Sequence, residues 1–136
     1  MDMTVQISRS AWAAIHRSVA ASPLEVCGLL LGRNGFVEEA RACRNVHPAP
    51  ASHFELDPAM LFAVLRAARA GGPQVIGHYH SHPSGDVMPS ITDAAAATAD
   101  GAVWLIVAGR EARAWRAVRD GAVHGRFDPL PLVVAR

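Results

Sequence analysis

The sequence predicts an α+β fold in one domain, with a mixed, mainly antiparallel sheet flanked by helices. The 136 residues are close to the usual size of a single domain, and 51% are apolar, so the chain can bury one substantial core. Helical segments and apolar extended runs share the chain without the strict alternation of a parallel βαβ sheet. No repeat, low-complexity linker or second domain is visible, so residues 1–136 are expected to form one unit.

The first third of the chain predicts a helix followed by a hairpin. Residues 8–22 open on serines that suit an N-cap and place large side chains at helical spacing: Trp12, Ile15, His16 and Val19. Residues 25–33 (EVCGLLLGR) and 36–46 (FVEEARACRNV) are extended runs on either side of the turn signal Asn34-Gly35. These two runs are therefore expected to pair as antiparallel strands.

A second helix is predicted after a loop punctuated by prolines. Asp57 can cap it, and Pro58 suits its first position, where no backbone N–H is needed. One face would carry the apolar residues Leu61, Val64, Leu65 and Ala68, and the helix would end at Gly71-Gly72.

The second half of the chain predicts a strand, a third helix and three further strands. Residues 73–80 (PQVIGHYH) form the first strand, and a turn-rich loop leads to a helix that begins at Ser90. The buried run 102–109 (AVWLIVAG) is the next strand. Residues 111–121 and 122–127 give two more around Asp120-Gly121, and a proline-containing tail follows.

Composition excludes several classes of protein. Thirteen basic against twelve acidic residues leave a formal charge of +1, which supplies no basic stripe for nucleic acid or for a membrane surface. Two cysteines without C-x-x-C spacing indicate reduced thiols and no disulfide framework. The polar N-terminus is unlike a signal peptide, and no apolar run has membrane-spanning length. We therefore expect a cytoplasmic protein.

The segment 77–93, GHYHSHPSGDVMPSITD, carries the clearest chemical signal. His78, His80 and His82 stand at alternate positions, so in an extended chain their side chains point to one side. A Pro-Ser-Gly turn follows and can bring Asp93 back toward them from the first turn of the third helix. Two imidazoles and one carboxylate suit a catalytic zinc ion and leave a fourth position for water.

Ser90 and Asp93 also match a purely structural pattern. They occupy the N-cap and N3 positions of the third helix, where such caps are worth about 1 kcal/mol. The two roles are compatible for Ser90, whose hydroxyl could also donate to a tetrahedral intermediate. Asp93, by contrast, is expected to give up its part in the capping box if it binds a metal.

A hydrolytic site also needs a base, which the segment itself lacks. Glu25 is the most interesting candidate, because a carboxylate at the start of the apolar run EVCGLLLG is hard to explain by packing. Partial burial would raise its pKa toward the useful range, and the charge of a metal would oppose that shift. Taken alone, such a glutamate is more often a surface carboxylate, so its role depends on the resemblance described next.

These residues resemble the motif of the JAMM (MPN-plus, Mov34/JAB) zinc metalloproteases. The pattern H-S-H-P, six residues, S, two residues, D is met by residues 80–83, Ser90 and Asp93, with Glu25 upstream. The resemblance implies a cytidine-deaminase-like α-β sandwich and one catalytic Zn²⁺ ion held by His80, His82 and Asp93. It also implies that the zinc-bound water attacks with Glu25 as general base and acid, and that Ser90 stabilises the oxyanion.

The resemblance further implies a class of substrate. The family cleaves peptide or isopeptide bonds after the C-terminal glycine of ubiquitin and ubiquitin-like proteins, and this chain is most similar to its small stand-alone bacterial members. The expected partner is therefore a ubiquitin-like or sulfur-carrier protein ending in Gly-Gly. The identity of that carrier, the type of bond and the oligomeric state stay open.

Two other functions are alternatives. A non-catalytic MPN-type interaction scaffold would use the same fold, although such relatives usually lack the ligands that are present here. A RadC-like DNA-repair role is suggested by the shared H-x-H-P-S-G pattern, but no helix-hairpin-helix region or basic face accompanies it. A zinc nucleoside deaminase is weaker still, because its H-x-E and P-C-x-x-C elements are absent.

The remaining candidate residues are interpreted structurally. His78 points to the side of the ligands and is at most a supporting residue. Cys27 is expected to be a small buried strand residue, since no Cys-His signature surrounds it. The other histidines are expected to be structural or solvent-facing, namely His16, His47, His53 and His124, and the tryptophans are expected to lie in the core, namely Trp12, Trp104 and Trp115.

Overall fold

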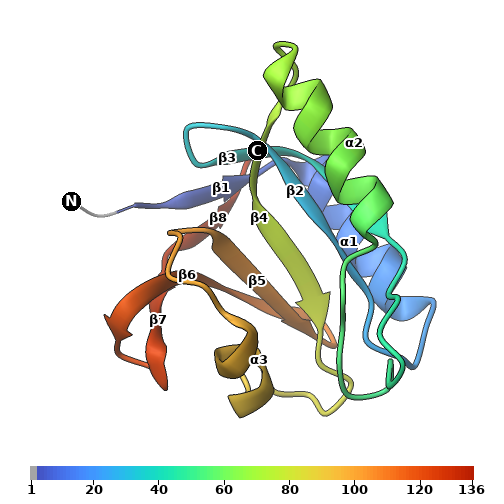
Figure 1. The fold of residues 1–136 in the computed structure, drawn as a ribbon, viewed down its shortest axis with the longest axis vertical. Coiled ribbons are helices and arrows are strands. Elements are labelled where there is room, and N and C mark those ends of the chain that lie inside the picture. The colour runs from blue at the N-terminus through green and yellow to red at the C-terminus, as the bar shows by residue number, and fades with distance from the viewer. Residues whose placement is uncertain (1–2) are drawn as a thin grey trace.

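A computed structural model describes residues 3–136 as one mixed sheet with three helices (Figure 1). The elements in chain order are β1 (Val5–Ile7), α1 (Arg9–Ala20), β2 (Cys27–Arg33), β3 (Phe36–Cys43), α2 (Pro58–Arg69), β4 (Gln74–Ser81), α3 (Ile91–Ala96), β5 (Val103–Ala108), β6 (Glu111–Gly121), β7 (Gly125–Leu130) and β8 (Leu132–Val134). No helix in this part of the chain is long and apolar enough to cross a bilayer.

The sheet has eight strands in the order β7-β6-β5-β4-β2-β3-β1-β8. Four neighbouring pairs are antiparallel, which are β2-β3, β2-β4, β5-β6 and β6-β7. The pairs β4-β5, β1-β3 and β1-β8 are parallel. The prediction of a mixed, mainly antiparallel sheet is confirmed, and β4 lies in its centre between β2 and β5.

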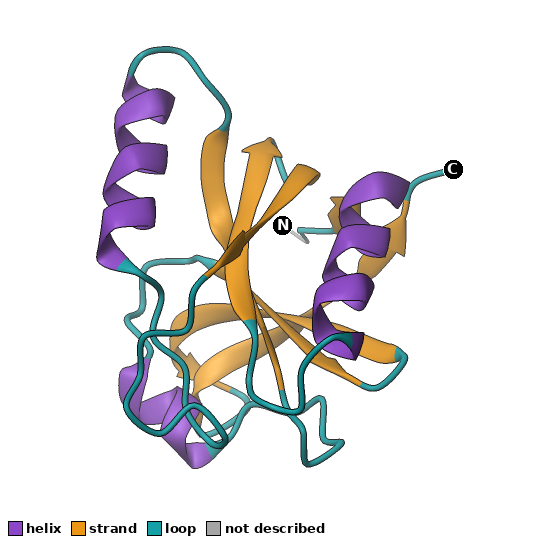
Figure 2. Cartoon of the chain, turned by 90° about the vertical axis from the view of Figure 1, so that its right-hand side faces the viewer, coloured by secondary structure: helices purple, strands orange, loops and turns teal. Residues whose placement is uncertain are grey.

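The helices cover both faces of this sheet, and Figure 2 shows the two longer ones on opposite sides. Alternation along the strands decides which residue meets which helix. On one face, Leu30 and Tyr79 join Ile15 of α1 in the largest apolar cluster. On the other face, Leu29 packs with Val64 of α2. A third cluster on Trp104, Ile106 and Trp115 lies beneath α3 and includes Ala94 and Ala97.

Local signals in the sequence account for most element boundaries. Ser8 caps α1 by accepting a hydrogen bond from the N–H of Ala11, and Asp57 caps α2 ahead of Pro58. The β2-β3 hairpin turns at Asn34 and Gly35, both of which have positive φ. These predictions are confirmed.

The sequence predicted no strand before residue 8, and it predicted the C-terminal end of the chain wrongly. The N-terminal segment contains β1, and the tail expected after residue 127 contains the second half of β7 and all of β8. The hairpin expected around Asp120-Gly121 turns later, at residues 122–124, because β6 continues to Gly121, which pairs with Gly125. β1 and β8 have three residues each, too few to show a periodic pattern, and they exist because they pair with each other and β1 pairs with β3.

Gly77 is required by the close approach of β4 and β5. It lies opposite Val103, and a Cβ at this position would collide with the backbone oxygen of that residue. We expect Gly77→Ala to lower the free energy of unfolding by at least about 1–3 kcal/mol, the usual cost of overpacking. Urea denaturation measures this cost, and a variant with wild-type stability would contradict the tight β4-β5 contact.

Candidate metal centre

Strand β4 positions the two histidines of the predicted ligand pair. Cys27 of β2 lies opposite His80, and β5 borders the other side of the strand, so the backbone here is held from both directions. His82 follows the last strand residue, but its N–H donates to the carbonyl of Val107 at 2.8 Å and keeps it in register. The side chains of both histidines are therefore buried on the α2 and α3 face, with His80 0% exposed.

Helix α3 brings Asp93 to these histidines. Asp93 Oδ1 lies 3.1 Å from His80 Nε2, and its Oδ2 lies 3.0 Å from His82 Nε2. The capping box is also complete, because Ser90 Oγ accepts the N–H of Asp93 at 2.9 Å and Asp93 Oδ2 accepts the N–H of Ser90 at 2.9 Å. Asp93 thus faces both histidines while it stays in the capping box, because its Oδ2 accepts from Ser90 and also contacts His82. That Asp93 gives up the capping box when it binds a metal stays a prediction.

The loop that connects β4 to α3 is held by three aromatic ring N–H groups. The carbonyls of residues 86, 87 and 89 accept from His82 Nδ1 at 2.7 Å, from Trp115 Nε1 at 3.1 Å and from His124 Nε2 at 2.9 Å. A carbonyl only accepts, so Nδ1 of His82 carries a proton and, in the neutral ring, leaves the lone pair on Nε2. His124, predicted to be structural or solvent-facing, helps to position the start of α3.

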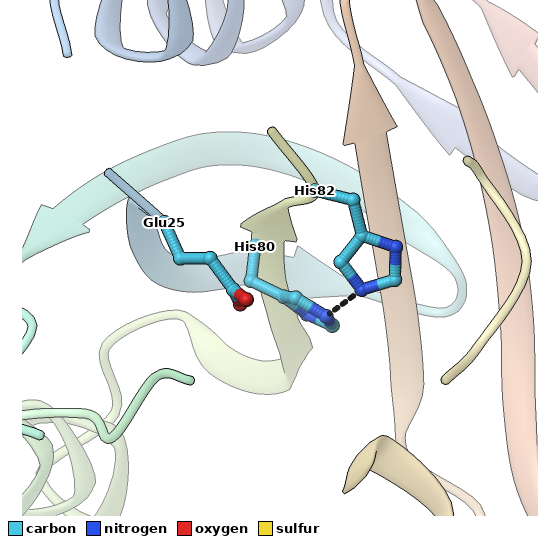
Figure 3. Close-up of side chains that lie close together, drawn as sticks. All are labelled: Glu25, His80 and His82. Carbon is cyan, nitrogen blue, oxygen red and sulfur yellow. Dashed lines mark hydrogen bonds between the residues drawn. The ribbon is translucent and has the colours of Figure 1, made fainter. Parts of the chain in front are cut away.

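The side chains of His80, His82 and Asp93 lie close enough together to bind one metal ion. The Nε2 atoms of His80 and His82 lie 3.1 Å apart, as Figure 3 shows for the two rings. This distance is similar to the distance from each Nε2 atom to the carboxylate of Asp93. Ligands at zinc distances of about 2.0–2.1 Å in a tetrahedral arrangement are about 3.3 Å from one another. The observed separations fit such an ion with only slight outward movement of the side chains.

The charge states of these groups also suit a cation. Burial alone would raise the pKa of Asp93, but hydrogen bonds from His80 and His82 lower it well below the ordinary value, so the carboxylate is ionised. Burial lowers the pKa of His80 and keeps this ring neutral. Burial opposes protonation of His82 too, but its hydrogen bond with Asp93 raises its pKa overall, and a bound metal would displace that proton.

Glu25 lies beside the pair of histidines, two residues before β2 begins. Its carboxylate and the ring nitrogens of His80 and His82 all lie within 4.8 Å of one another (Figure 3). Asp93 makes a tighter set with the same histidines, so the geometry favours Asp93 as the third ligand and leaves Glu25 slightly farther away. Burial raises the pKa of Glu25 to about 7, with His82 opposing the shift and Asp93 adding to it.

Glu25 and Ser90 open into the same cavity of about 210 Å³. Its lining consists of Glu25, Ala51, Ser52, His82, Pro83, Ser84, Ser90 and Thr92. Ser90 Oγ is an acceptor in the helix cap, so its hydroxyl hydrogen remains free to donate into this space. The structure thus brings together all five residues selected from the sequence: Glu25, His80, His82, Ser90 and Asp93.

No sequence pattern indicated Phe54, which packs on the buried ring of His80. Phe54 stacks on His80 with ring centroids 4.2 Å apart and planes at 18°. A phenylalanine in a proline-rich loop carries no pattern that would have predicted this contact. His78 packs against Trp104 at 4.4 Å, and its Nδ1 has no hydrogen-bond partner within residues 3–136. Burial lowers the pKa of His78 to about 3, so it is an uncharged part of the aromatic cluster.

Cys27 occupies the buried position expected for it. It is 1% exposed, and both it and Cys43, its neighbour across the β2-β3 pair, are free thiols. Burial raises the pKa of Cys27 to about 12, which keeps the sulfur protonated and unreactive.

Comparison with known proteins identifies the family. A family profile described as prokaryotic homologs of the JAB domain matches residues 8–118. A desampylase of Haloferax volcanii is 41% identical over 62% of this chain and 62% of its own length, so the match spans less than two thirds of that relative. A desampylase of Pyrococcus furiosus is 35% identical over 75% of this chain and 73% of its own. A probable TtuB-protein conjugate cleaving protease of Thermus thermophilus is 39% identical over 53% of this chain and 48% of its own.

Solved structures share the fold over nearly the whole chain. A protein of Desulfitobacterium hafniense superimposes with a TM-score of 0.82 at 23% identity, covering 98% of this chain and 94% of its own. A JAB1/MPN domain protein of Archaeoglobus fulgidus superimposes with a TM-score of 0.61 at 21% identity, covering 98% of both chains. The JAMM resemblance and the α+β fold class are therefore confirmed. The chain belongs to the family of prokaryotic homologs of the JAB domain.

Proposed function

We propose that this protein is a zinc-dependent peptidase or isopeptidase that hydrolyses the bond after the C-terminal glycine of a ubiquitin-like protein. The observation that carries the proposal is the convergence of His80, His82 and Asp93 next to a cavity that also contains Glu25. The names of the Haloferax, Pyrococcus and Thermus relatives support the substrate class. Sulfur carriers of ubiquitin-like fold are included among the candidate partners.

His80, His82 and Asp93 would hold the zinc ion, two through Nε2 and the third through its carboxylate. When bound, zinc supplies a Lewis acid and a water of lowered pKa. The chain orients its ligands through the Nδ1 hydrogen bond of His82, the stacking of Phe54 on His80, and the helix cap that holds Asp93. These contacts limit rotation of the three side chains before any metal binds.

Glu25 would accept the proton of the attacking water and return it to the departing amine. A group with a pKa near neutrality is suited to both steps, because it is basic enough to accept the proton and acidic enough to release it again. Its burial at 7% exposure, which raises its pKa to about 7, supports this role. Ser90 would donate its free hydroxyl hydrogen to the oxygen that becomes negatively charged.

The lining of the cavity is consistent with a glycine at the scissile bond. Four of the lining residues have small side chains, which are Ala51, Ser52, Ser84 and Ser90. Small side chains let an extended backbone approach closely, and the polar groups of the lining can bond to its N–H and C=O groups. An extended glycine segment fits such a lining.

The direct experiment uses zinc-loaded protein and several ubiquitin-like or sulfur-carrier proteins ending in Gly-Gly. Each carrier is presented both with a peptide extension and as an isopeptide conjugate to lysine, and mass spectrometry locates the cut. We expect cleavage directly after the terminal glycine, and the preferred substrate form distinguishes a peptidase from an isopeptidase. Failure of the zinc-loaded protein to cut any carrier in either form would reject the substrate assignment.

Metal analysis distinguishes the enzyme from a non-catalytic scaffold. A scaffold would fold and bind a partner without metal, whereas the proposed enzyme should contain roughly one zinc ion per chain. The complete donor set supports the enzyme, because nothing about a scaffold requires a buried carboxylate facing two buried imidazoles.

A further inference from the structure

The side chain of Asn45 forms four hydrogen bonds, which use all the donors and acceptors that it typically offers in proteins. Its Nδ2 donates to the carbonyl of Glu25 at 2.9 Å and to the carbonyl of His53 at 2.9 Å. Its Oδ1 accepts the N–H of His47 at 3.1 Å and the N–H of Glu55 at 3.1 Å. One amide therefore joins the segment before β2 to both ends of the loop that follows β3.

The position of Glu25 depends on this loop. Glu25 precedes the first residue of β2, Cys27, and neither of its own backbone polar groups bonds to a neighbouring strand in the part of the chain that the structure describes. Its N–H donates to the carbonyl of Pro50 at 2.8 Å, and its carbonyl accepts from Asn45. Both backbone polar groups of Glu25 are thus bonded to the segment between residues 45 and 50.

The same amide shapes the part of the loop that faces the metal centre. Its bonds to His53 and Glu55 flank Phe54, which stacks on His80. The loop also provides Ser52 to the lining of the cavity that contains Glu25. A backbone bond from the N–H of residue 46 to the carbonyl of residue 55, at 3.0 Å, closes the loop beside Asn45.

We propose that Asn45 is a positioning residue that holds Glu25 at its working place and couples it to the loop beside the metal ligands. This role rests on the function proposed above. Asn45 acts through the carbonyl of Glu25 and not on the substrate. Because displacement of a catalytic group by about 1 Å can cost 100-fold in rate, one lost bond at this point should be visible in kcat.

Two substitutions distinguish the hydrogen bonds that Asn45 Nδ2 donates from those that its Oδ1 accepts. Asn45→Ala removes all four hydrogen bonds. Asn45→Asp keeps an acceptor for the N–H groups of His47 and Glu55 but has no donor for the carbonyl of Glu25 when it is ionised. For both variants we expect kcat to fall by about 10- to 100-fold, with KM and zinc content close to those of the wild type.

The matched control is Gln74→Ala. Gln74 is also an amide that bridges backbone carbonyls, donating to Ala68 at 3.3 Å and to Gly72 at 3.4 Å, but it lies at the end of β4 farthest from His80. Its loss should leave kcat unchanged. Equal losses of kcat in the Gln74 and Asn45 variants would show a general effect of stability and overturn the proposal.

Amide hydrogen exchange, followed by NMR in metal-free protein, tests the same role without catalysis. We expect Asn45→Ala to accelerate exchange at Glu25, His47 and Glu55, and Asn45→Asp to accelerate it mainly at Glu25, while β5 stays protected. Unchanged exchange at Glu25 would overturn the proposal. If the wild-type protein cleaves no substrate, the proposed function fails, and exchange still decides whether Asn45 holds Glu25.

Discussion

Glu25→Gln is expected to lower kcat by about 100- to 10,000-fold, the usual contribution of a general acid–base group. Glutamine has nearly the same shape, so the backbone bonds of residue 25 to Pro50 and Asn45 should persist. Its amide cannot take up a proton at neutral pH. Zinc should remain bound, because His80, His82 and Asp93 form the tighter donor set. Steady-state kinetics with parallel zinc analysis measures both outcomes.

The pH dependence gives a second measure of the same residue. Glu25 accepts a proton only when it is ionised, so kcat/KM should rise with pH through its pKa and then level off. Burial raises this pKa from 4.5 to about 7, and the positive charge of zinc opposes the rise, so the acidic limb should lie between these values. The limb should be absent from the residual activity of Glu25→Gln.

The control for this profile is the zinc content at each pH, since acid also protonates the ligands and releases metal. An acidic limb that persists in Glu25→Gln while zinc stays bound would assign the limb to another group. Zinc loss in Glu25→Gln under conditions where the wild type retains it would instead indicate that Glu25 is itself a ligand.

His80→Ala and Asp93→Asn are expected to weaken zinc binding by at least about 100-fold, the upper range seen when residues supporting a ligand are lost. His80 is buried, and the nearby His78 is not free to replace it, because His78 packs against Trp104 and Phe54. Asn at position 93 removes the negative charge but keeps an oxygen that can accept the N–H of Ser90. Both variants should also lose cleavage.

Metal titration and circular dichroism together test this prediction. Asp93→Asn should retain helix α3 while it loses zinc, which separates metal binding from helix capping. The matched control is His16→Ala, which removes one histidine from α1 on the opposite face of the sheet. This variant should retain zinc. Zinc binding of wild-type strength in both His80→Ala and Asp93→Asn would reject the assigned ligand set.

The fold was predictable where local signals and tertiary pairing agree. The caps at Ser8 and Asp57, the Asn34-Gly35 turn and the buried run of β5 each depend on a few neighbouring residues. β1 and β8 were missed because each is a three-residue strand stabilised by partners far away in the chain. Three residues are too few to show a periodic pattern.

The candidate site was likewise predictable only where it depends on residues close together in the sequence. Neighbouring residues were enough to predict the candidate ligands, because alternation along one strand places His80 and His82 on one side and a capping pattern places Asp93 at a helix start. The tertiary structure alone shows how Glu25 reaches them, because that depends on the pairing of β2 with β4 and on the hydrogen bond from Asn45 to the carbonyl of Glu25. It also decided that Phe54 stacks on His80 and that His124 holds the loop before α3. Local geometry follows from adjacent residues, whereas contacts between segments distant in the chain exist only after the sheet has brought those segments together.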